Sequence, residues 1–145
     1  MELVKKLADV YDTVGACAVD DHGLVVAGVS TGGLILKLPG RVGDSAIPGA
    51  GFYASSRVAC SATGIGEKII LSMPCRKLAE YMDQGLKLQE ALDKTIEYVN
   101  KTVGKDTMGF IAVDREGNIG WRYNTEAMLI GYIKDANVYV ELQST

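Results

Sequence analysis

The clearest helical periodicity of this sequence lies in one central block, and segments with the composition of β-strands lie on both sides of it. Residues 88–103 show the longest helical pattern, and shorter patterns cover residues 64–73 and 75–84. The apolar face of the longest pattern consists of Leu88, Ala91, Leu92, Thr95, Ile96 and Val99. The order β, then α, then β, with the helices grouped together, predicts an α+β fold.

A β-hairpin is predicted near the start of the chain. Residues 12–20 and 24–31 are rich in small and β-branched side chains, and Asp21-His22-Gly23 between them supplies turn chemistry. Further strands are predicted, in chain order, at residues 57–62, 108–114, 118–123, 128–133 and 138–141. Residues 2–11 carry apolar side chains at helical spacing, which predicts a short amphipathic helix or a processing segment.

Glycine and proline interrupt the regular patterns between residues 32 and 51. This segment is rich in glycine and contains Pro39 and Pro48, a composition that favours an irregular backbone. Loops of this kind often carry binding and catalytic residues. We therefore expect a site to involve this segment.

Composition narrows the classes of function. The chain has 145 residues, 48% of them hydrophobic, which fits one globular domain, and its net charge of −3 gives no basic surface for nucleic acid. No segment is apolar for long enough to span a membrane, and a cytoplasmic location is expected. Cys17, Cys60 and Cys75 are odd in number and widely spaced, which predicts free thiols rather than a disulfide framework or a metal site.

The sequence contains an internal echo that creates two candidate nucleophiles. The pattern that begins at Asp12-Thr13 recurs at Asp106-Thr107, with a constant offset of 107 − 13 = 94 residues. The simplest interpretation is two similar hairpins, each with a glycine at its turn. The polar, glycine-rich segment follows Thr13 and not Thr107, so Thr13 is the favoured nucleophile. The alternative interpretation is that Thr13 is only a β-branched residue of a strand.

Several stretches resemble, in one order, the plant-type asparaginase and isoaspartyl peptidase family. They are Asp12-Thr13-Val14-Gly15-Ala16, Ser30-Thr31-Gly32-Gly33, Pro39-Gly40-Arg41-Val42-Gly43-Asp44-Ser45, Gly49-Ala50-Gly51-Phe52-Tyr53-Ala54 and Thr63-Gly64-Ile65-Gly66-Glu67. Any one of them could arise elsewhere, but the ordered set is specific. The resemblance continues more weakly from Gly109 to Met128 and so covers most of the chain.

This resemblance implies an N-terminal nucleophile hydrolase with a four-layer α/β/β/α sandwich, of which the chain supplies the C-terminal half. The family's precursors cleave themselves before a threonine, which corresponds here to cleavage between Asp12 and Thr13. Residues 1–12 would then be a pre-nucleophile segment, and residues 13–145 the nucleophile-bearing half-domain. Cleavage would create a free α-amine, with a pKa of about 8, beside the threonine hydroxyl that needs a base.

The resemblance also assigns roles to residues that the motifs match. Thr31 would support the nucleophile, with a turn cap as its alternative. Arg41 would bind the α-carboxylate of the substrate and Asp44 its α-amine, with a surface salt bridge inside the loop as the alternative for this pair. Thr63 and Gly64 would form the oxyanion hole, with helix capping as the alternative for Thr63.

The implied activity is hydrolysis of the side-chain amide of L-asparagine, of β-aspartyl peptides, or of both, without a metal or other cofactor. Ile35 and Leu36 stand where many members have threonine and asparagine, so the fine shape of the pocket stays open. The threonine protease taspase, which has the same fold, lacks an aspartate at the position of Asp44. The presence of Asp44 in this chain therefore favours asparagine or β-aspartyl peptides as substrates over an internal site in a protein. A taspase-like or glycosylasparaginase-like hydrolase remains an alternative.

The partners implied are a small-molecule substrate, a complementary N-terminal half and a second αβ unit, which together give a heterotetramer. Only twelve residues precede Thr13. The other half is therefore expected to be a separate chain, or the sequence is a shortened form or an inactive remnant that only binds a partner or ligand. Alone, the chain is expected to expose an apolar face of its sheets. His22 is expected to be solvated and without a catalytic role.

Overall fold

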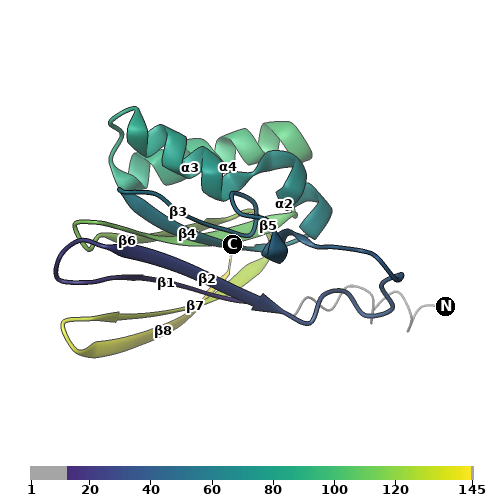
Figure 1. The fold of residues 1–145 in the computed structure, drawn as a ribbon, viewed down its shortest axis with the longest axis horizontal. Helices are drawn as coiled ribbons and strands as arrows, with labels where there is room; N and C mark the ends of the chain where they lie inside the picture. Colours follow the sequence, from purple (N-terminus) through teal and green to yellow (C-terminus); the bar gives the residue numbers. More distant parts are fainter. Residues whose placement is uncertain (1–12, 145) are drawn as a thin grey trace.

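The computed structural model describes residues 13–144, and their strands and helices follow the predicted order (Figure 1). The N-terminal elements are β1 (Thr13–Val19), β2 (Val25–Thr31), the 3₁₀ turn η1 (Asp44–Ala46), β3 (Phe52–Ala54) and β4 (Val58–Gly64). The remaining elements are α2 (Gly66–Ser72), α3 (Pro74–Asp83), α4 (Leu88–Val103), β5 (Met108–Asp114), β6 (Ile119–Tyr123), β7 (Ala127–Lys134) and β8 (Asn137–Ser144). The helix or processing segment predicted at residues 2–11 lies outside the described residues.

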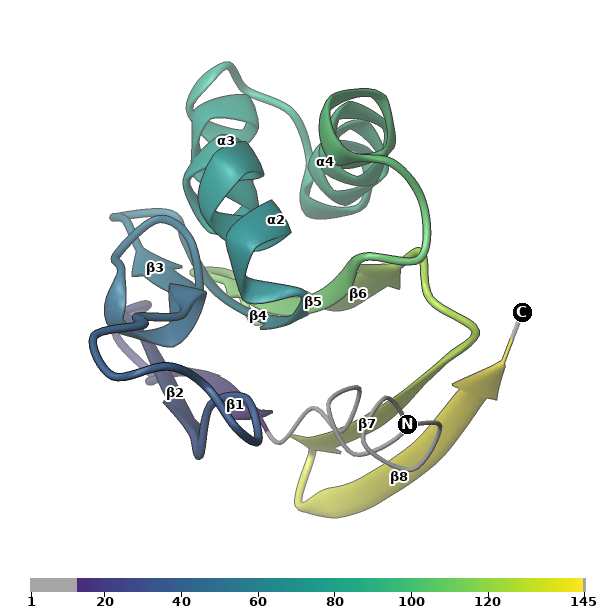
Figure 2. The same cartoon turned by 90° about the vertical axis from the view of Figure 1, so that its right-hand side faces the viewer.

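Three layers are visible when the molecule is viewed along its strands (Figure 2). The middle layer is an antiparallel sheet in the order β3-β4-β5-β6. The helices α2, α3 and α4 cover one face of this sheet, and the hairpins β1–β2 and β7–β8 lie on its other side. The mixed α+β class predicted from the sequence is therefore observed.

The main core lies between the helices and the middle sheet. Leu78 of α3 and Leu92 and Val99 of α4 are fully buried there, against Val58 of β4 and Phe110 of β5. The helical residues recur at the spacing of one helix face, as the periodicity predicted. Because burying these side chains is the largest favourable contribution to folding, this interface holds the helices on the sheet.

A second, smaller core joins the hairpin β1–β2 to the opposite face of the sheet. Val25 of β2, Ala59 of β4 and Val113 of β5 are buried in it, and Cys17 of β1 packs against them. Strands β4 and β5 are thus buried on both faces, because alternate residues point toward the helices and toward the hairpin. Burial raises the pKa of the Cys17 thiol far above its ordinary value. All three cysteines are free, as predicted.

Aromatic stacking joins the hairpin β7–β8 to the sheet. The ring of Tyr132 lies 5.8 Å from that of Trp121 on β6 and 4.7 Å from that of Tyr139 on β8, measured between centroids. Ile130, on the same inward face of β7, is only 3% exposed. The two hairpins therefore reach the same sheet through different contacts.

The outer face of both hairpins is apolar and exposed, as the sequence led us to expect. Seven large side chains on it are each more than half exposed: Val14, Val26, Leu129, Ile133, Val138, Val140 and Leu142. Within residues 13–144 no helix covers this face, so the fourth layer implied by the family resemblance is not part of the described structure. None of the described helices combines the length and the apolar character of a membrane span.

The sequence missed two short elements. Strand β3 has only three residues, too few to show an alternating pattern, and it forms because residues 52–54 pair with residues 59–61 of β4. The turn η1 lies inside the segment expected to be irregular, and the Ile47 N–H donates to the Asp44 carbonyl to close it. Strand β8 also runs past its predicted end at Glu141.

The main core gives the first prediction. Replacing Leu92 with alanine should lower the free energy of unfolding by about 3 kcal/mol, because Leu92 is fully buried and the helix and sheet can close only part of the space left. Leu142→Ala, at a position 70% exposed, is the matched control and should change it by less than about 0.5 kcal/mol. Chemical denaturation measures both, and equal effects would contradict the assignment of the core.

Candidate active site

Two threonine hydroxyls meet at the open end of the hairpin β1–β2. The register of the hairpin places Thr13 opposite Thr31, and the Thr13 hydroxyl donates to the Thr31 hydroxyl over 3.2 Å. The Thr31 Oγ1 also accepts a hydrogen bond from the Gly33 N–H at 3.0 Å. This contact follows directly from the length of the two strands and the turn between them.

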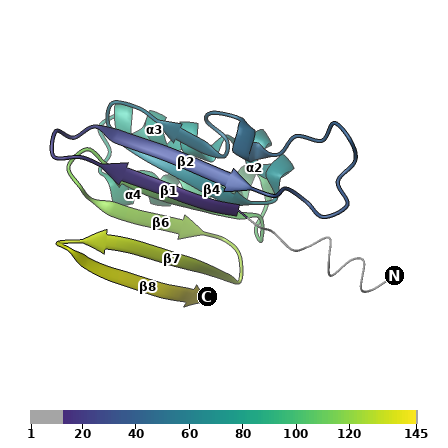
Figure 3. The same cartoon turned by 60° about the horizontal axis from the view of Figure 1, so that its bottom comes forward.

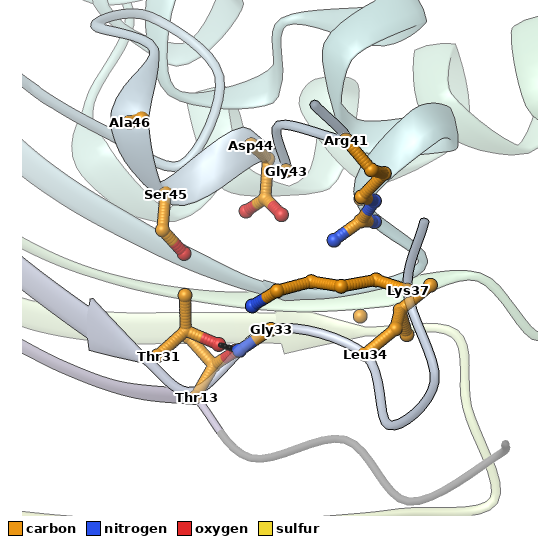
Figure 4. A pocket seen from close by; sticks show the side chains of 12 residues that line it. Thr13, Thr31, Gly33, Leu34, Lys37, Arg41, Gly43, Asp44, Ser45 and Ala46 are labelled. Carbon is orange, nitrogen blue, oxygen red and sulfur yellow. Dashed lines mark hydrogen bonds between the residues drawn. The ribbon is translucent and has the colours of Figure 1, made fainter. Parts of the chain in front are cut away.

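A cavity of about 110 Å³ opens beside this hydroxyl pair (Figure 4). It is bounded by the end of the hairpin, the glycine-rich segment and the start of α2. The residues that line it are Thr13, Thr31, Gly33, Leu34, Lys37, Arg41, Gly43, Asp44, Ser45, Ala46, Gly64 and Gly66. Of the seven predicted site residues, five therefore border one cavity: Thr13, Thr31, Arg41, Asp44 and Gly64. Thr63 does not line it, and Asp12, on the other side of the predicted cleavage site, lies outside the described residues.

Arg41 forms an ion pair with a residue that the sequence analysis gave no role. Its Nε and Nη2 donate to the two carboxylate oxygens of Glu67, at 2.9 and 3.1 Å, in a bidentate contact. The Arg41 guanidinium holds the pKa of the Glu67 carboxyl below its usual value, and the same bond raises the pKa of Arg41. Glu67 belongs to the motif that begins at Thr63, and that membership was the one signal in the sequence that pointed to it.

Asp44 is a buried carboxylate at the wall of the cavity. Asp44 is the first residue of η1 and is only 6% exposed. Its Oδ2 has no hydrogen-bond partner among the described residues. Burial raises the pKa of the Asp44 carboxyl, and its own backbone N–H and the charge of Arg41 offset part of that rise. The surface salt bridge considered for Arg41 and Asp44 is not formed, because Asp44 is buried and Arg41 binds Glu67.

Glycine allows these charged groups to approach the start of α2. A Cβ on Gly66 would lie 2.7 Å from Nη2 of Arg41 and 3.0 Å from Oδ1 of Asp44. Gly64 has φ of +141°, and a Cβ there would lie 2.3 Å from the Thr107 carbonyl oxygen. Larger residues at either position would push the cavity wall apart. The sequence predicted a helical pattern over residues 64–73, and α2 begins at Gly66.

Lys37 is a second cation that the sequence analysis did not assign. It lines the cavity (Figure 4). Its Nζ donates to the Gly32 carbonyl over 2.7 Å, which closes the first part of the loop onto itself. The four charged groups near the cavity come from the loop and from α2: Lys37, Arg41, Asp44 and Glu67. Within residues 13–144 no group of three or more His, Cys, Asp and Glu side chains is placed to hold a metal ion.

Thr107, the rival nucleophile, is buried away from the cavity. It is 4% exposed, and its hydroxyl donates to the Gly104 carbonyl at 3.2 Å. The Asn124 carboxamide accepts from its backbone N–H at 2.9 Å and donates to its hydroxyl at 3.1 Å. These contacts give Thr107 a structural role at the start of β5.

The internal echo corresponds to two hairpins with the same turn. The Asp20 carboxylate accepts from the N–H groups two and four residues later, at 2.9 and 2.8 Å. Asp114 accepts in the same way, at 2.9 and 2.9 Å. Gly23 and Gly117 complete the two turns with positive φ. The interpretation of the echo as similar hairpins is confirmed, and His22, 92% exposed in the first turn, lies outside the cavity.

Comparison with known proteins identifies the class. A family model described as asparaginase matches residues 2–141. The chain is 48% identical over 139 residues to a plant-type L-asparaginase of Pyrobaculum calidifontis, covering 95% of this chain and 46% of that protein. It is 46% identical over 118 residues to an isoaspartyl peptidase of Escherichia coli, covering 80% of this chain and 36% of that protein.

The chain therefore belongs to the asparaginase family, in agreement with the resemblance seen in the sequence. A Pyrococcus horikoshii plant-type L-asparaginase, 44% identical over 135 residues, gives the same result. The chain spans less than half the length of each of these three relatives.

The buried carboxylate gives the second prediction. Because the pKa of Asp44 is higher in the folded chain than its ordinary value of 3.8, the stability that Asp44 contributes is greatest at low pH and falls as the pH rises through its folded pKa. Asp44→Asn should remove this fall and raise the free energy of unfolding at neutral pH by about 1 kcal/mol. Thermal unfolding from acidic to neutral pH measures the difference between the two proteins.

Asp21→Asn is the control, because it removes one negative charge from the exposed turn of the hairpin β1–β2. It should follow the native protein across the pH range. A difference between native protein and Asp44→Asn that does not change with pH would contradict the burial argument.

Proposed function

We propose that this chain is the nucleophile-bearing half of a threonine amidohydrolase that acts on L-asparagine and β-aspartyl peptides. The observation that carries the proposal is the Thr13–Thr31 hydroxyl pair, which borders a cavity together with Arg41 and Asp44. The relatives named plant-type L-asparaginase and isoaspartyl peptidase support the same substrate class.

Thr13 is proposed to become the nucleophile after the bond between Asp12 and Thr13 is cleaved. The new α-amine takes the proton from Oγ1, and Oγ1 attacks the carbonyl carbon of the substrate amide. The Thr31 hydroxyl, 3.2 Å away, orients Oγ1. The tetrahedral intermediate collapses with departure of ammonia or an amino acid, which takes the proton from the amine, and water then hydrolyses the threonyl ester.

The developing oxyanion is proposed to bind the Gly64 N–H and the Thr63 hydroxyl. Gly64 lines the cavity directly, and the N–H of the next residue, Ile65, donates to the Thr107 carbonyl at 2.8 Å, which keeps this part of the backbone in place. Donors fixed in this way cost little reorganisation during the reaction and can each change the rate by a factor of about 100. Thr63 lies one residue earlier on β4 and would need its side chain turned toward the cavity.

Arg41 and Asp44 are proposed to select the head group of an α-amino acid. A guanidinium suits the α-carboxylate, and a buried carboxylate with one oxygen unpartnered among the described residues suits the α-ammonium group. An ammonium near Asp44 would stabilise the ionised carboxylate that burial disfavours. The free energy spent on burying Asp44 would thus be recovered when substrate binds.

A complementary half is proposed to complete the four-layer α/β/β/α sandwich. The uncovered apolar face of the two hairpins supports this, because contiguous exposed apolar surface of this kind marks a contact surface. The assembly proposed is a cytoplasmic dimer of αβ units, that is, a heterotetramer.

Processing gives the third prediction. Intact-mass measurement of the protein, produced with its complementary half, should show loss of residues 1–12 and a remaining piece of 145 − 12 = 133 residues. Thr13→Ala should keep the full-length mass, and Thr107→Ala should be processed like the native chain, because Thr107 lies outside the cavity. Turnover of asparagine by a chain of unchanged full-length mass would refute the free-amine mechanism.

Turnover gives the fourth prediction. Ammonia release from L-asparagine should appear when the chain is combined with a complementary half, and Asp44→Asn should lower kcat/KM by about 100-fold through loss of the charge that binds the substrate ammonium. Asp21→Asn is again the control and should leave kcat/KM unchanged. An assembled complex that binds asparagine without releasing ammonia would show that the chain is a binding half instead of an enzyme subunit.

A further inference from the structure

Among the described residues that line the active-site cavity, Lys37 is the charged one that the proposed chemistry does not use. Its backbone lies on the glycine-rich segment, and its side chain runs along the cavity with the ammonium end directed toward Gly33 and Thr31 (Figure 4). The Nζ donates to the Gly32 carbonyl over 2.7 Å. A cation is therefore held next to the hydroxyl pair and apart from Arg41.

Lys37 and the Thr31 hydroxyl bind opposite ends of one peptide group. The carbonyl that accepts from Lys37 belongs to Gly32, and the N–H of the same peptide, that of Gly33, donates to Thr31 Oγ1 at 3.0 Å. A hydrogen bond from a charged donor is stronger than one from a neutral donor, and bonds in a chain polarise one another. Lys37 thus orients this peptide and makes its N–H a stronger donor to Thr31.

Gly33 gives the ammonium the room that this contact needs. A Cβ on Gly33 would lie only 2.5 Å from the Lys37 Nζ, so the ammonium packs directly against the glycine. Gly33 also has φ of +76°, which side chains other than glycine rarely adopt. The conformation that turns the Gly33 N–H toward Thr31 is therefore the one against which Lys37 packs.

The loop turns back on itself to bring Lys37 to this position. Figure 3 shows the segment after β2 projecting beyond the end of the hairpin before it returns to the helical layer. The Lys37 N–H donates to the Leu34 carbonyl at 3.3 Å, and Leu36, between them, has φ of +62°. This left-handed conformation is costly for leucine, and Leu36 is 73% exposed, so apolar burial among the described residues does not offset the cost. What the turn achieves is the return of the Lys37 side chain to Gly32.

We propose that Lys37 is a positioning residue for the nucleophile. Its ammonium fixes the peptide between Gly32 and Gly33, this peptide holds the Thr31 hydroxyl, and the Thr31 hydroxyl orients Thr13 Oγ1, 3.2 Å away. When Thr13 gives its proton to the α-amine, the Thr31 hydroxyl can donate to the charge left on Oγ1. A strong N–H donor on Thr31 makes its hydroxyl a better donor in that step. This inference rests on the proposed function, because it assigns Lys37 a part in activating Thr13.

Turnover by a set of variants forms the fifth prediction. Lys37→Met keeps most of the apolar stem and removes the charge and the donor. In the chain combined with its complementary half, it should lower kcat for ammonia release from L-asparagine by about tenfold or more, because Thr31 is no longer held in place. KM should stay within about twofold, since Arg41 and Asp44, which are proposed to bind the head group, are unchanged.

A double variant tests whether Lys37 acts through Thr31. Thr31→Val keeps the shape of the side chain and removes the hydroxyl, so Lys37→Met should have no further effect when it is added to Thr31→Val. Lys94→Met is the matched control, because Lys94 is exposed on α4, outside the cavity lining, and loses the same charge. It should leave kcat and KM unchanged. Intact mass confirms that each variant has lost residues 1–12 before it is assayed.

Hydrogen exchange tests the contact without relying on turnover. In the uncombined chain, the Gly33 amide should exchange about tenfold faster in Lys37→Met than in the native protein, because the peptide that carries it is released. Lys94→Met should exchange like the native protein at Gly33. This measurement needs no cleavage, so it decides the matter if Lys37→Met is not processed.

Three results would overturn the proposal. They are a rise in KM with kcat unchanged, which would make Lys37 a substrate-binding residue, effects of Lys37→Met and Thr31→Val that multiply, and a Gly33 amide that exchanges equally in native protein and Lys37→Met. A native complex without turnover, in which Gly33 exchange still depends on Lys37, would reject the proposed function and keep the contact through which Lys37 holds Thr31.

Discussion

Burial of β4 and β5 on both faces is the interaction on which the rest of the structure depends. One face of these strands packs against α3 and α4, and the other packs against β1–β2 through Val25, Ala59 and Val113. This small second core attaches the hairpin to the sheet and so helps to fix where its open end lies. Because Thr13 and Thr31 stand at that end, the position of the hydroxyl pair follows from packing at the far side of the sheet.

The candidate site places charged side chains close together and buries one of them, the Asp44 carboxylate, at a cost in free energy. Because Gly66 has no side chain, the side chains of Arg41 and Asp44 can both lie close to its backbone. Glu67 holds the Arg41 guanidinium in a bidentate contact. Asp44 is buried with one oxygen unpartnered among the described residues, which disfavours its charged form. A buried carboxylate whose charged form is disfavoured lowers the stability of the chain at neutral pH, and local costs of this kind are typical of functional sites.

The sequence predicted the parts of the fold that have a strong local cause. The hairpin turns follow from an aspartate and a glycine at fixed spacing, and α4 follows from its apolar face. Strand β3 and the pairing of Arg41 with Glu67 could not be predicted in this way, because both depend on residues that are distant in the chain and adjacent only after folding. The sequence motifs correctly selected Arg41, Asp44 and Gly64 as residues of one cavity. Thr63 belongs to the same motif as Gly64 but does not line the cavity.

The register of the hairpin β1–β2 fixes both the hydroxyl pair and the outer edge of β1. Along β1, the residues that pair without hydrogen bonds to β2 direct their backbone groups away from β2, and Thr13 is the first of them. The register that sets Thr13 opposite Thr31 is therefore the same register that sets the free edge. A shift of one residue would exchange the bonded and non-bonded positions and turn the Thr13 side chain to the other face of the hairpin, so the hydroxyl pair depends on this one register.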